Sequence, residues 1–188
     1  MNIVDKITAC RLCDNHLPLG ARPIIQFSPV AKILISGQAP SLKVHETGRL
    51  FSDQSGETLR SWLGVNEMQF YDPSIFAIVP MAFCYPGKGK SGDLPPPKIC
   101  AQTWQPSLKP LLYDVKLHIL LGQYSQRYFC KSFKSVTYQV SQWESTLPHS
   151  IALPHPSPRN QPWQTKNPWF KKELIPELQV QIKKLINS

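Results

Sequence analysis

The sequence predicts an α/β protein of three layers, α/β/α, in which helices cover both faces of a central, mainly parallel, four-stranded sheet. Two observations predict this fold. Four short apolar runs have the length of buried strands, and segments with helical spacing of apolar residues separate them. Strands that alternate with helices favour parallel pairing, because each helix carries the chain back across the sheet. No flexible linker divides the chain, so we expect one domain over residues 1–188.

The four predicted strands are rich in Ile, Leu, Val and Ala, and they comprise residues 32–36, 75–79, 117–122 and 150–153. The first strand runs directly into Gly37-Gln38-Ala39-Pro40, which predicts a tight turn. In open α/β sheets, ligands bind where strands end and loops begin. We therefore expect the loop over residues 37–51 to form the floor of a ligand pocket.

Helices are predicted over residues 2–9, after the N-cap candidates in residues 52–57, over residues 124–130, and from Asn167-Pro168 onward. In the second of these, Leu59, Trp62 and Leu63 share one face. The last helix places apolar residues at helical spacing and contains Pro176, where we expect a kink. Residues 84–100 are rich in Gly, Pro and Lys, which predicts a loop.

Composition limits the cellular setting and the partners. The sequence of 188 residues is 41% hydrophobic and contains no run of eighteen apolar residues, so we expect no helix that spans a membrane, and we do not expect a membrane as the main partner. The first residues lack the features of a signal peptide, which predicts a cytoplasmic protein. The net charge is +9, and residues 121–188 carry nine Lys and Arg against three Asp and Glu. This excess favours a nucleic acid as partner, although a solvated lysine-rich surface or an anionic membrane would also account for it.

Four cysteines stand in segments of low periodicity: Cys10 and Cys13 as a C-x2-C pair, and Cys84 and Cys100 further along the chain. Two such pairs fit a closed site of four thiolates, which would hold either a [4Fe-4S] cluster or structural zinc. The alternative is that they are small buried apolar residues. Cys130 lies in an apolar helical segment, where we expect it to belong to the core.

Three segments carry a resemblance to a known family: Gly37-Gln38-Ala39-Pro40, Thr47-Gly48-Arg49-Leu50-Phe51, and His155-Pro156-Ser157-Pro158-Arg159-Asn160. Together they resemble the uracil-DNA glycosylase superfamily. The cysteine arrangement is similar to that of its iron–sulfur (family 4) branch, and the last segment is similar to that of the single-strand-selective branch.

The resemblance implies specific roles. Phe51 would stack on a base flipped out of DNA, with Gly37, Gln38, Ala39 and Pro80 around the base edge. His155 would donate a hydrogen bond to the departing base anion. Ser157, Arg159 and Asn160 would contact DNA, with Arg159 filling the gap left by the flipped nucleotide. Without these motifs, we would interpret Phe51 as an aromatic residue of the core and His155 as a structural residue of a loop.

The chain departs from the family pattern at the residues that would activate water. Gln38 stands where the family 4 pattern has a glutamate, and Ala39 also lacks a carboxylate. Pro80 stands at the place of a base-reading asparagine. We therefore expect catalysis to rest on Glu46 first and His45 second, with Asp53 nearby.

The sequence thus predicts a monofunctional, monomeric DNA repair enzyme that hydrolyses the N-glycosidic bond of uracil or a related deaminated base. No lysine is placed to form a Schiff base. Because Gln38 and Pro80 alter the pocket edge, a glycosylase for another damaged base such as hypoxanthine is the first alternative. A non-catalytic, metal-bearing DNA-binding protein of the same fold is the second.

Overall fold

The computed structural model describes residues 2–188, so of the predicted domain only Met1 lies outside it. Its centre is a four-stranded sheet in the order β2-β1-β5-β6, with every neighbouring pair parallel. The strands are β1 (Ile33–Ser36), β2 (Phe76–Ile78), β5 (Leu117–Leu121) and β6 (Ser150–Leu153). The predicted fold class and all four predicted strands are confirmed.

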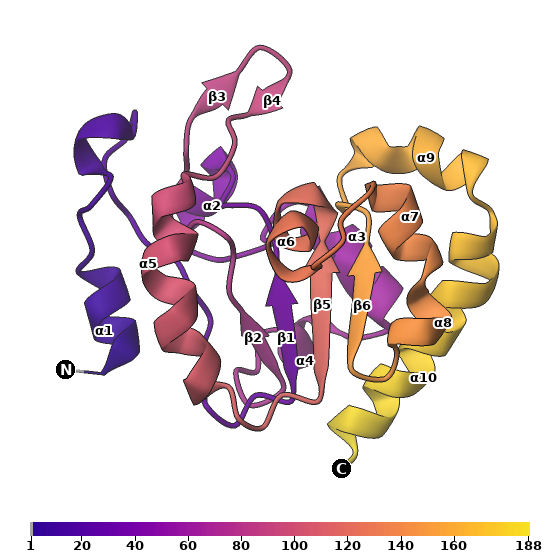
Figure 1. The fold of residues 1–188 in the computed structure, drawn as a ribbon. Helices are drawn as coiled ribbons and strands as arrows, with labels where there is room; N and C mark the ends of the chain where they lie inside the picture. Colours follow the sequence, from indigo (N-terminus) through magenta and orange to yellow (C-terminus); the bar gives the residue numbers. More distant parts are fainter. Residues whose placement is uncertain (1) are drawn as a thin grey trace.

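The side chains of β1 point alternately to the two faces of the sheet, and this explains the three layers. Ile33 and Ile35 of β1 belong to the larger apolar core, whereas Leu34 between them belongs to a smaller core on the other face. Successive side chains of a strand point to opposite faces, so both faces of β1 must be covered. The larger core is completed by α3 (Gln54–Leu63) and α10 (Ile175–Ile186), and the smaller one by α1 (Ile3–Thr8) and α5 (Lys98–Leu108). Figure 1 shows the helices on the two sides of the sheet.

The remaining elements are short. The other α-helices are α2 (Leu42–Thr47), α4 (Glu67–Phe70), α6 (Gly122–Phe129), α7 (Val136–Ser141), α8 (Trp143–Thr146) and α9 (Gln161–Lys166). Turns of 3-10 helix cover Asp14–His16, Lys109–Leu111 and Pro158–Asn160, and a π-helical turn covers Phe170–Leu174. None of the helices in residues 2–188 is both long enough and apolar enough to cross a membrane.

Two segments predicted as loops contain regular structure. Residues 37–51 include α2, which begins because the Ser41 side chain accepts a hydrogen bond from the Val44 N–H. Residues 84–100 include a hairpin of β3 (Lys88–Gly89) and β4 (Gly92–Asp93), followed by the first turn of α5. Cys100 therefore lies on a helix. Cys130 caps the end of α6 and is only partly buried.

Caps and prolines set the helix ends. Asp53 caps α3 by accepting a hydrogen bond from the Gly56 N–H, as the sequence suggests. Asn167 does not cap the last helix, because its side chain donates instead to the Trp163 carbonyl within α9. The π-helical turn ends two residues before Pro176, which lies in the first turn of α10, where a missing N–H costs no hydrogen bond.

One polar pair lies within the sheet. The Ser36 hydroxyl on β1 and Nε2 of His118 on β5 are 2.9 Å apart, and the edge of the His118 ring meets Phe129. Burial, with a smaller effect of the Lys109 charge, lowers the pKa of His118 to about 4. His118 is therefore neutral in the folded protein at neutral pH.

Acidification should weaken the fold through His118. Above pH 6.5 His118 is neutral whether the chain is folded or unfolded, but between pH 6.5 and about 4 only the unfolded chain takes up its proton. We expect this residue to lower the free energy of unfolding by about 3 kcal/mol across that range. Urea denaturation at pH 7 and pH 4 measures the loss. The His118→Gln variant should lose less than the native protein, and an equal loss in both would contradict the prediction.

Candidate active site

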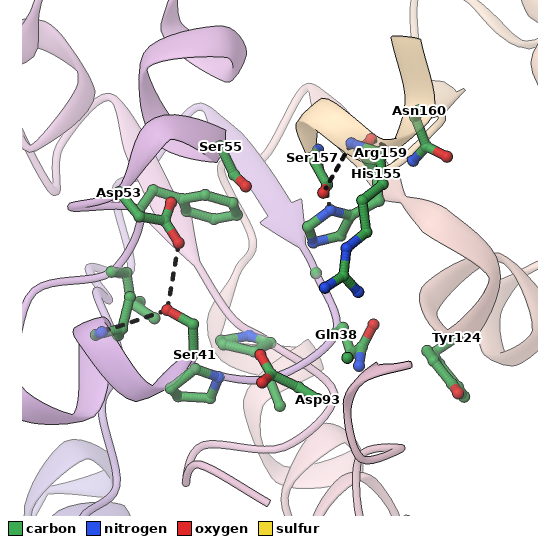
Figure 2. Close-up of a pocket in the computed structure, with 18 of the residues that line it drawn as sticks. Gln38, Ser41, Asp53, Ser55, Asp93, Tyr124, His155, Ser157, Arg159 and Asn160 are labelled. Carbon is green, nitrogen blue, oxygen red and sulfur yellow. Dashed lines mark hydrogen bonds between the residues drawn. The ribbon is translucent and has the colours of Figure 1, made fainter. Parts of the chain in front are cut away.

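A cavity of about 520 Å³ opens at the carboxyl ends of β1 and β6. Figure 2 shows polar side chains from several segments converging on it. The residues that line it come from the turn after β1, the start of α3, the β3–β4 hairpin, the start of α6 and the loop after β6. Among them are ten residues that the sequence indicated: Gly37, Gln38, Ala39, Phe51, Asp53, Pro80, His155, Ser157, Arg159 and Asn160.

The floor of the cavity is held by backbone pairing beyond the ends of the strands. The carbonyl oxygens of Gly37 and Gln38 accept hydrogen bonds from the N–H groups of Met81 (3.0 Å) and Ala82 (3.1 Å). These bonds continue the pairing of β1 with the segment after β2, and they place Pro80 in the cavity wall. Proline has no side-chain hydrogen-bonding group, so at this position only the main chain can contact a polar ligand.

Phe51 occupies the cavity wall in a strained backbone conformation. Its φ of 54° is unfavourable for a residue with a bulky side chain. Its carbonyl oxygen accepts hydrogen bonds from the Tyr71 hydroxyl (3.1 Å) and the Arg60 guanidinium (3.3 Å). Gly56 leaves room for this oxygen, since a Cβ at residue 56 would collide with it. The ring approaches Gly37, where an added Cβ would lie 3.6 Å from Phe51 Cζ.

His155 has a defined tautomer. Its Nδ1 accepts a hydrogen bond from the Ser157 N–H at 3.2 Å, so in the neutral ring the proton is on Nε2. Burial lowers the pKa of His155 below 6.5, and the nearby Asp53 carboxylate only partly offsets this shift. At neutral pH the cavity therefore holds a neutral imidazole that can donate one hydrogen bond from Nε2.

The loop after β6 is stiffened by its own side chains. The Asn160 amide donates to the His155 carbonyl at 2.7 Å, and the Ser157 hydroxyl accepts from the Arg159 N–H at 3.3 Å. Arg159 reaches across the cavity and donates to the Ser91 carbonyl of the hairpin at 2.6 Å. The predicted DNA-contacting residues thus also fix the position of His155 and of the hairpin.

The structure does not bring His45 and Glu46 into the cavity. Both lie on α2, where Glu46 is exposed and the His45 ring packs near Tyr85, with ring centroids 6.2 Å apart. The Arg22 guanidinium donates to the backbone carbonyls of both residues, which fixes this end of the helix. The expectation that Glu46 activates water finds no support in this placement, because its carboxylate does not line the cavity.

Two other carboxylates line the cavity, those of Asp53 and Asp93. The sequence indicates Asp53, which follows Phe51 closely, but it does not indicate Asp93. It lies in a Gly-, Pro- and Lys-rich stretch with no periodicity, and it lines the cavity because Arg159 and Gln38 hold the hairpin there through the Ser91 and Leu94 carbonyls. The Gly92-Asp93 pair carries no sequence signal for this.

The four cysteines converge although the sequence separates them widely. Cys10, Cys13, Cys84 and Cys100 line one small pocket with Phe83 and Trp104 among its walls. Burial raises the pKa of Cys84 to about 11 and of Cys100 to about 12, so without a bound cation these thiols stay protonated. Within residues 2–188, no three His, Cys, Asp or Glu side chains are arranged as ligands of one metal ion.

Fold and site together define a class: a three-layer α/β protein whose ligand cavity lies at the carboxyl edge of a parallel sheet. The family model of the uracil DNA glycosylase superfamily matches residues 24–179, and the chain belongs to this superfamily. Its members act on DNA, and membership points to a DNA glycosylase. The matched residues include the floor of the cavity, Phe51 and the whole His155–Asn160 segment.

The Gly56→Ala substitution should be destabilising, although alanine normally favours a helix over glycine by about 1 kcal/mol. The added methyl would displace the Phe51 carbonyl and its two hydrogen bonds. We expect the free energy of unfolding, measured in urea, to fall by about 2 kcal/mol. Glu57→Ala, at an exposed position of the same helix, is the matched control. A Gly56→Ala protein as stable as the control would contradict the role assigned to Gly56.

Proposed function

We propose that the protein is a monofunctional glycosylase that hydrolyses the N-glycosidic bond of uracil, or of a related deaminated base, in DNA. One observation carries the proposal: a single cavity contains both an aromatic ring, that of Phe51, and a neutral histidine with a free Nε2–H. Its volume lies within the range of pockets that enclose small ligands. Stacking and a hydrogen bond to the departing base are what excision of a flipped base requires.

Each wall of the cavity has a part in this reaction. The base stacks on Phe51 while backbone groups of Gln38 and Ala39 contact its polar edge. As the glycosidic bond breaks, negative charge develops on the base oxygens, and the Nε2–H of His155 donates to one of them. A donor fixed beforehand in a partly buried site stabilises this charge more than water would.

The basic surface beside the cavity suits a DNA strand. A neighbouring groove shares Ser157 with the cavity and is lined by Lys171 and Lys172. We propose that phosphates lie along this groove and that Ser157, Arg159 and Asn160 contact the strand where the base is flipped. For Arg159 to fill the gap in the DNA, it must leave the Ser91 carbonyl.

A second candidate is a glycosylase for another lesion, such as hypoxanthine. The Gln38 side chain is engaged, since its amide donates to the Leu94 carbonyl at 3.3 Å, and Pro80 offers no side-chain donor. Base selection therefore rests mainly on main-chain groups, which favours a broader range of bases. A non-catalytic DNA-binding protein of the same fold is the remaining alternative.

We further propose that the four cysteines hold a [4Fe-4S] cluster, which takes one thiolate on each of its four irons and therefore does not need the thiols to surround a single ion. Structural zinc is the alternative, and it would require the thiols to move closer together. Support comes from their convergence on one apolar pocket and from the thiol donor set, which suits iron or zinc. A cluster would join residues 10–13, residue 84 and α5 into one unit. It supplies no chemistry to the reaction proposed here.

Purified protein should release uracil from a labelled single-stranded oligonucleotide, leaving abasic sites that break only after alkali. Parallel single- and double-stranded substrates carrying uracil or hypoxanthine separate the candidates. Cleavage of hypoxanthine alone would favour the second candidate, and tight binding without base release would favour the non-catalytic one. Strand breakage without alkali would contradict a monofunctional enzyme.

The His155→Ala variant should lower kcat for base release by about 10²–10³-fold, because it removes the donor to the departing base. KM should change little, since the donor acts mainly in the transition state. The matched control is His149→Ala, at an exposed position before β6. Because the neutral ring is the donor, the native rate should not fall as pH rises through the lowered pKa of His155, which lies below 6.5. A fall centred on that pKa would show that the protonated ring acts instead.

Protein purified without oxygen should be brown, with broad visible absorption and about four irons per chain. Cys84→Ser should lose the absorption, whereas Cys130→Ser should keep it, because Cys130 does not line the cysteine pocket. A colourless native protein that contains one zinc per chain would replace the cluster by structural zinc. Absence of both metals would contradict a metal site.

A further inference from the structure

Two carboxylates line the cavity, and they differ in how far the fold engages them. Asp53 is engaged by the fold: one oxygen accepts from the Gly56 N–H at 3.2 Å and the other from the Ser41 hydroxyl at 3.2 Å. Figure 2 shows the Ser41 bond. These bonds cap α3 and join it to the residue that caps α2. Asp53 therefore has a structural role, in which each of its carboxylate oxygens accepts one hydrogen bond.

Asp93 has no such task. It is the last residue of β4, at the rim of the cavity, and no group in residues 2–188 donates a hydrogen bond to its carboxylate. Partial burial raises the pKa of Asp93, and the charge of Arg159 opposes this rise without cancelling it. With its pKa raised, this carboxylate is a better proton acceptor than a fully solvated aspartate.

The hairpin that carries Asp93 is held on both sides of this residue. Arg159, from the loop that bears His155, donates to the Ser91 carbonyl, and Gln38, from the turn after β1, donates to the Leu94 carbonyl. Gly92 permits the first contact, because a Cβ there would collide with the Arg159 guanidinium. Figure 1 shows the hairpin above the carboxyl ends of the strands.

The hydrogen bond from Gln38 to the Leu94 carbonyl is relevant to the absence of a carboxylate at residue 38. A glutamate at residue 38 could not donate to the Leu94 carbonyl, because an ionised carboxylate only accepts hydrogen bonds. The amide can donate, and the residue it holds is the neighbour of Asp93. The amide of residue 38 and the carboxylate of residue 93 are therefore linked through a single hydrogen bond, which Gln38 donates to the neighbour of Asp93.

We propose that Asp93 is the catalytic carboxylate that orients and deprotonates the attacking water, and that Gln38 is a positioning residue that holds the hairpin in place. This inference rests on the proposed glycosylase function. It assigns the water-activating role to a residue 55 positions after the motif glutamine, instead of to Glu46 or His45.

In the proposed step, the water oxygen bonds to C1′ of the deoxyribose as the bond between C1′ and the base nitrogen breaks. The electron pair of the broken bond leaves on the base, whose oxygen accepts the hydrogen bond from His155. Water gives its proton to the Asp93 carboxylate, which releases it to solvent or to the base anion. The products are the free base and a C1′ hydroxyl, and no oxidant or reductant is needed.

Asp93→Asn should lower kcat for base release by about 10²–10⁴-fold without weakening binding of the substrate oligonucleotide. Glu144→Gln, an exposed carboxylate on α8, is the matched control. Glu46→Gln is the competing arm: if it abolishes base release while Asp93→Asn leaves it intact, the inference is overturned. Circular dichroism and urea unfolding show whether each variant is folded.

Two readouts separate a chemical role of Asp93 from a structural one. Formate should restore part of the activity of Asp93→Ala, because it supplies a small carboxylate, but should not restore His155→Ala. The native rate should fall as pH drops through the pKa of Asp93, and Asp93→Asn should lack this fall. Absence of rescue together with an unchanged pH profile would overturn the assignment.

Gln38→Glu tests the positioning role. If the motif merely lacks its carboxylate, this variant should be faster than the native protein. If Gln38 holds the hairpin, it should be at least about tenfold slower, and Gln38→Asn should not recover the rate, because its shorter amide cannot reach the Leu94 carbonyl. A faster Gln38→Glu enzyme would overturn the role of Gln38.

The outcome for the native protein separates this inference from the proposed function. If native protein releases none of the tested bases, the glycosylase function itself fails, and the inference fails with it. If native protein releases base and folded Asp93→Asn does so at a similar rate, only the inference fails.

Discussion

The backbone of Phe51 is the constraint on which the site depends. A left-handed conformation at a bulky residue costs on the order of 1–3 kcal/mol, so it persists only where its surroundings enforce it. The Phe51 carbonyl is held by Tyr71 and Arg60 and enclosed by Gly56. Because these partners lie on α3 and at the end of α4, the orientation of the ring is tied to the packing of α3 into the main core.

Around this ring, most polar groups of the cavity are already used by the fold. Asp53 caps α3, Asn160 braces the carbonyl of His155, and Nδ1 of His155 is engaged by the Ser157 N–H. Among the groups in residues 2–188 that the fold leaves without a hydrogen-bond partner are Nε2 of His155 and the carboxylate of Asp93. One is a donor suited to a departing anion and the other an acceptor suited to a water proton. A side chain without a hydrogen-bond partner in the fold is therefore a better candidate for a catalytic role than one chosen by residue type alone.

The sequence was sufficient for the sheet but not for the whole site. Apolar runs bounded by glycine and proline located all four strands, and compact motifs such as residues 155–160 contain their own turn chemistry. The placement of Glu46 could not be predicted from the sequence. It depends on the short helix α2, between Ser41 and Gly48, which turns Glu46 away from the cavity. Asp93 reaches the cavity through contacts of Arg159 and Gln38 with residues 68 and 56 positions away, which local pattern does not encode.

The cysteine pocket is connected to the cavity floor through one arginine. The Arg22 backbone N–H lies near enough to the Cys84 thiol to lower its pKa, which partly offsets the rise caused by burial, and the Arg22 guanidinium donates to the carbonyls at the end of α2. That helix leads through Gly48 to Phe51. Two residues on, the Ile24 N–H pairs with the Phe83 carbonyl at 2.8 Å, which keeps the same segment beside Cys84. A group bound by the four thiols would therefore fix the segment that positions α2, so its effect on the site would be structural even though it lies outside the cavity.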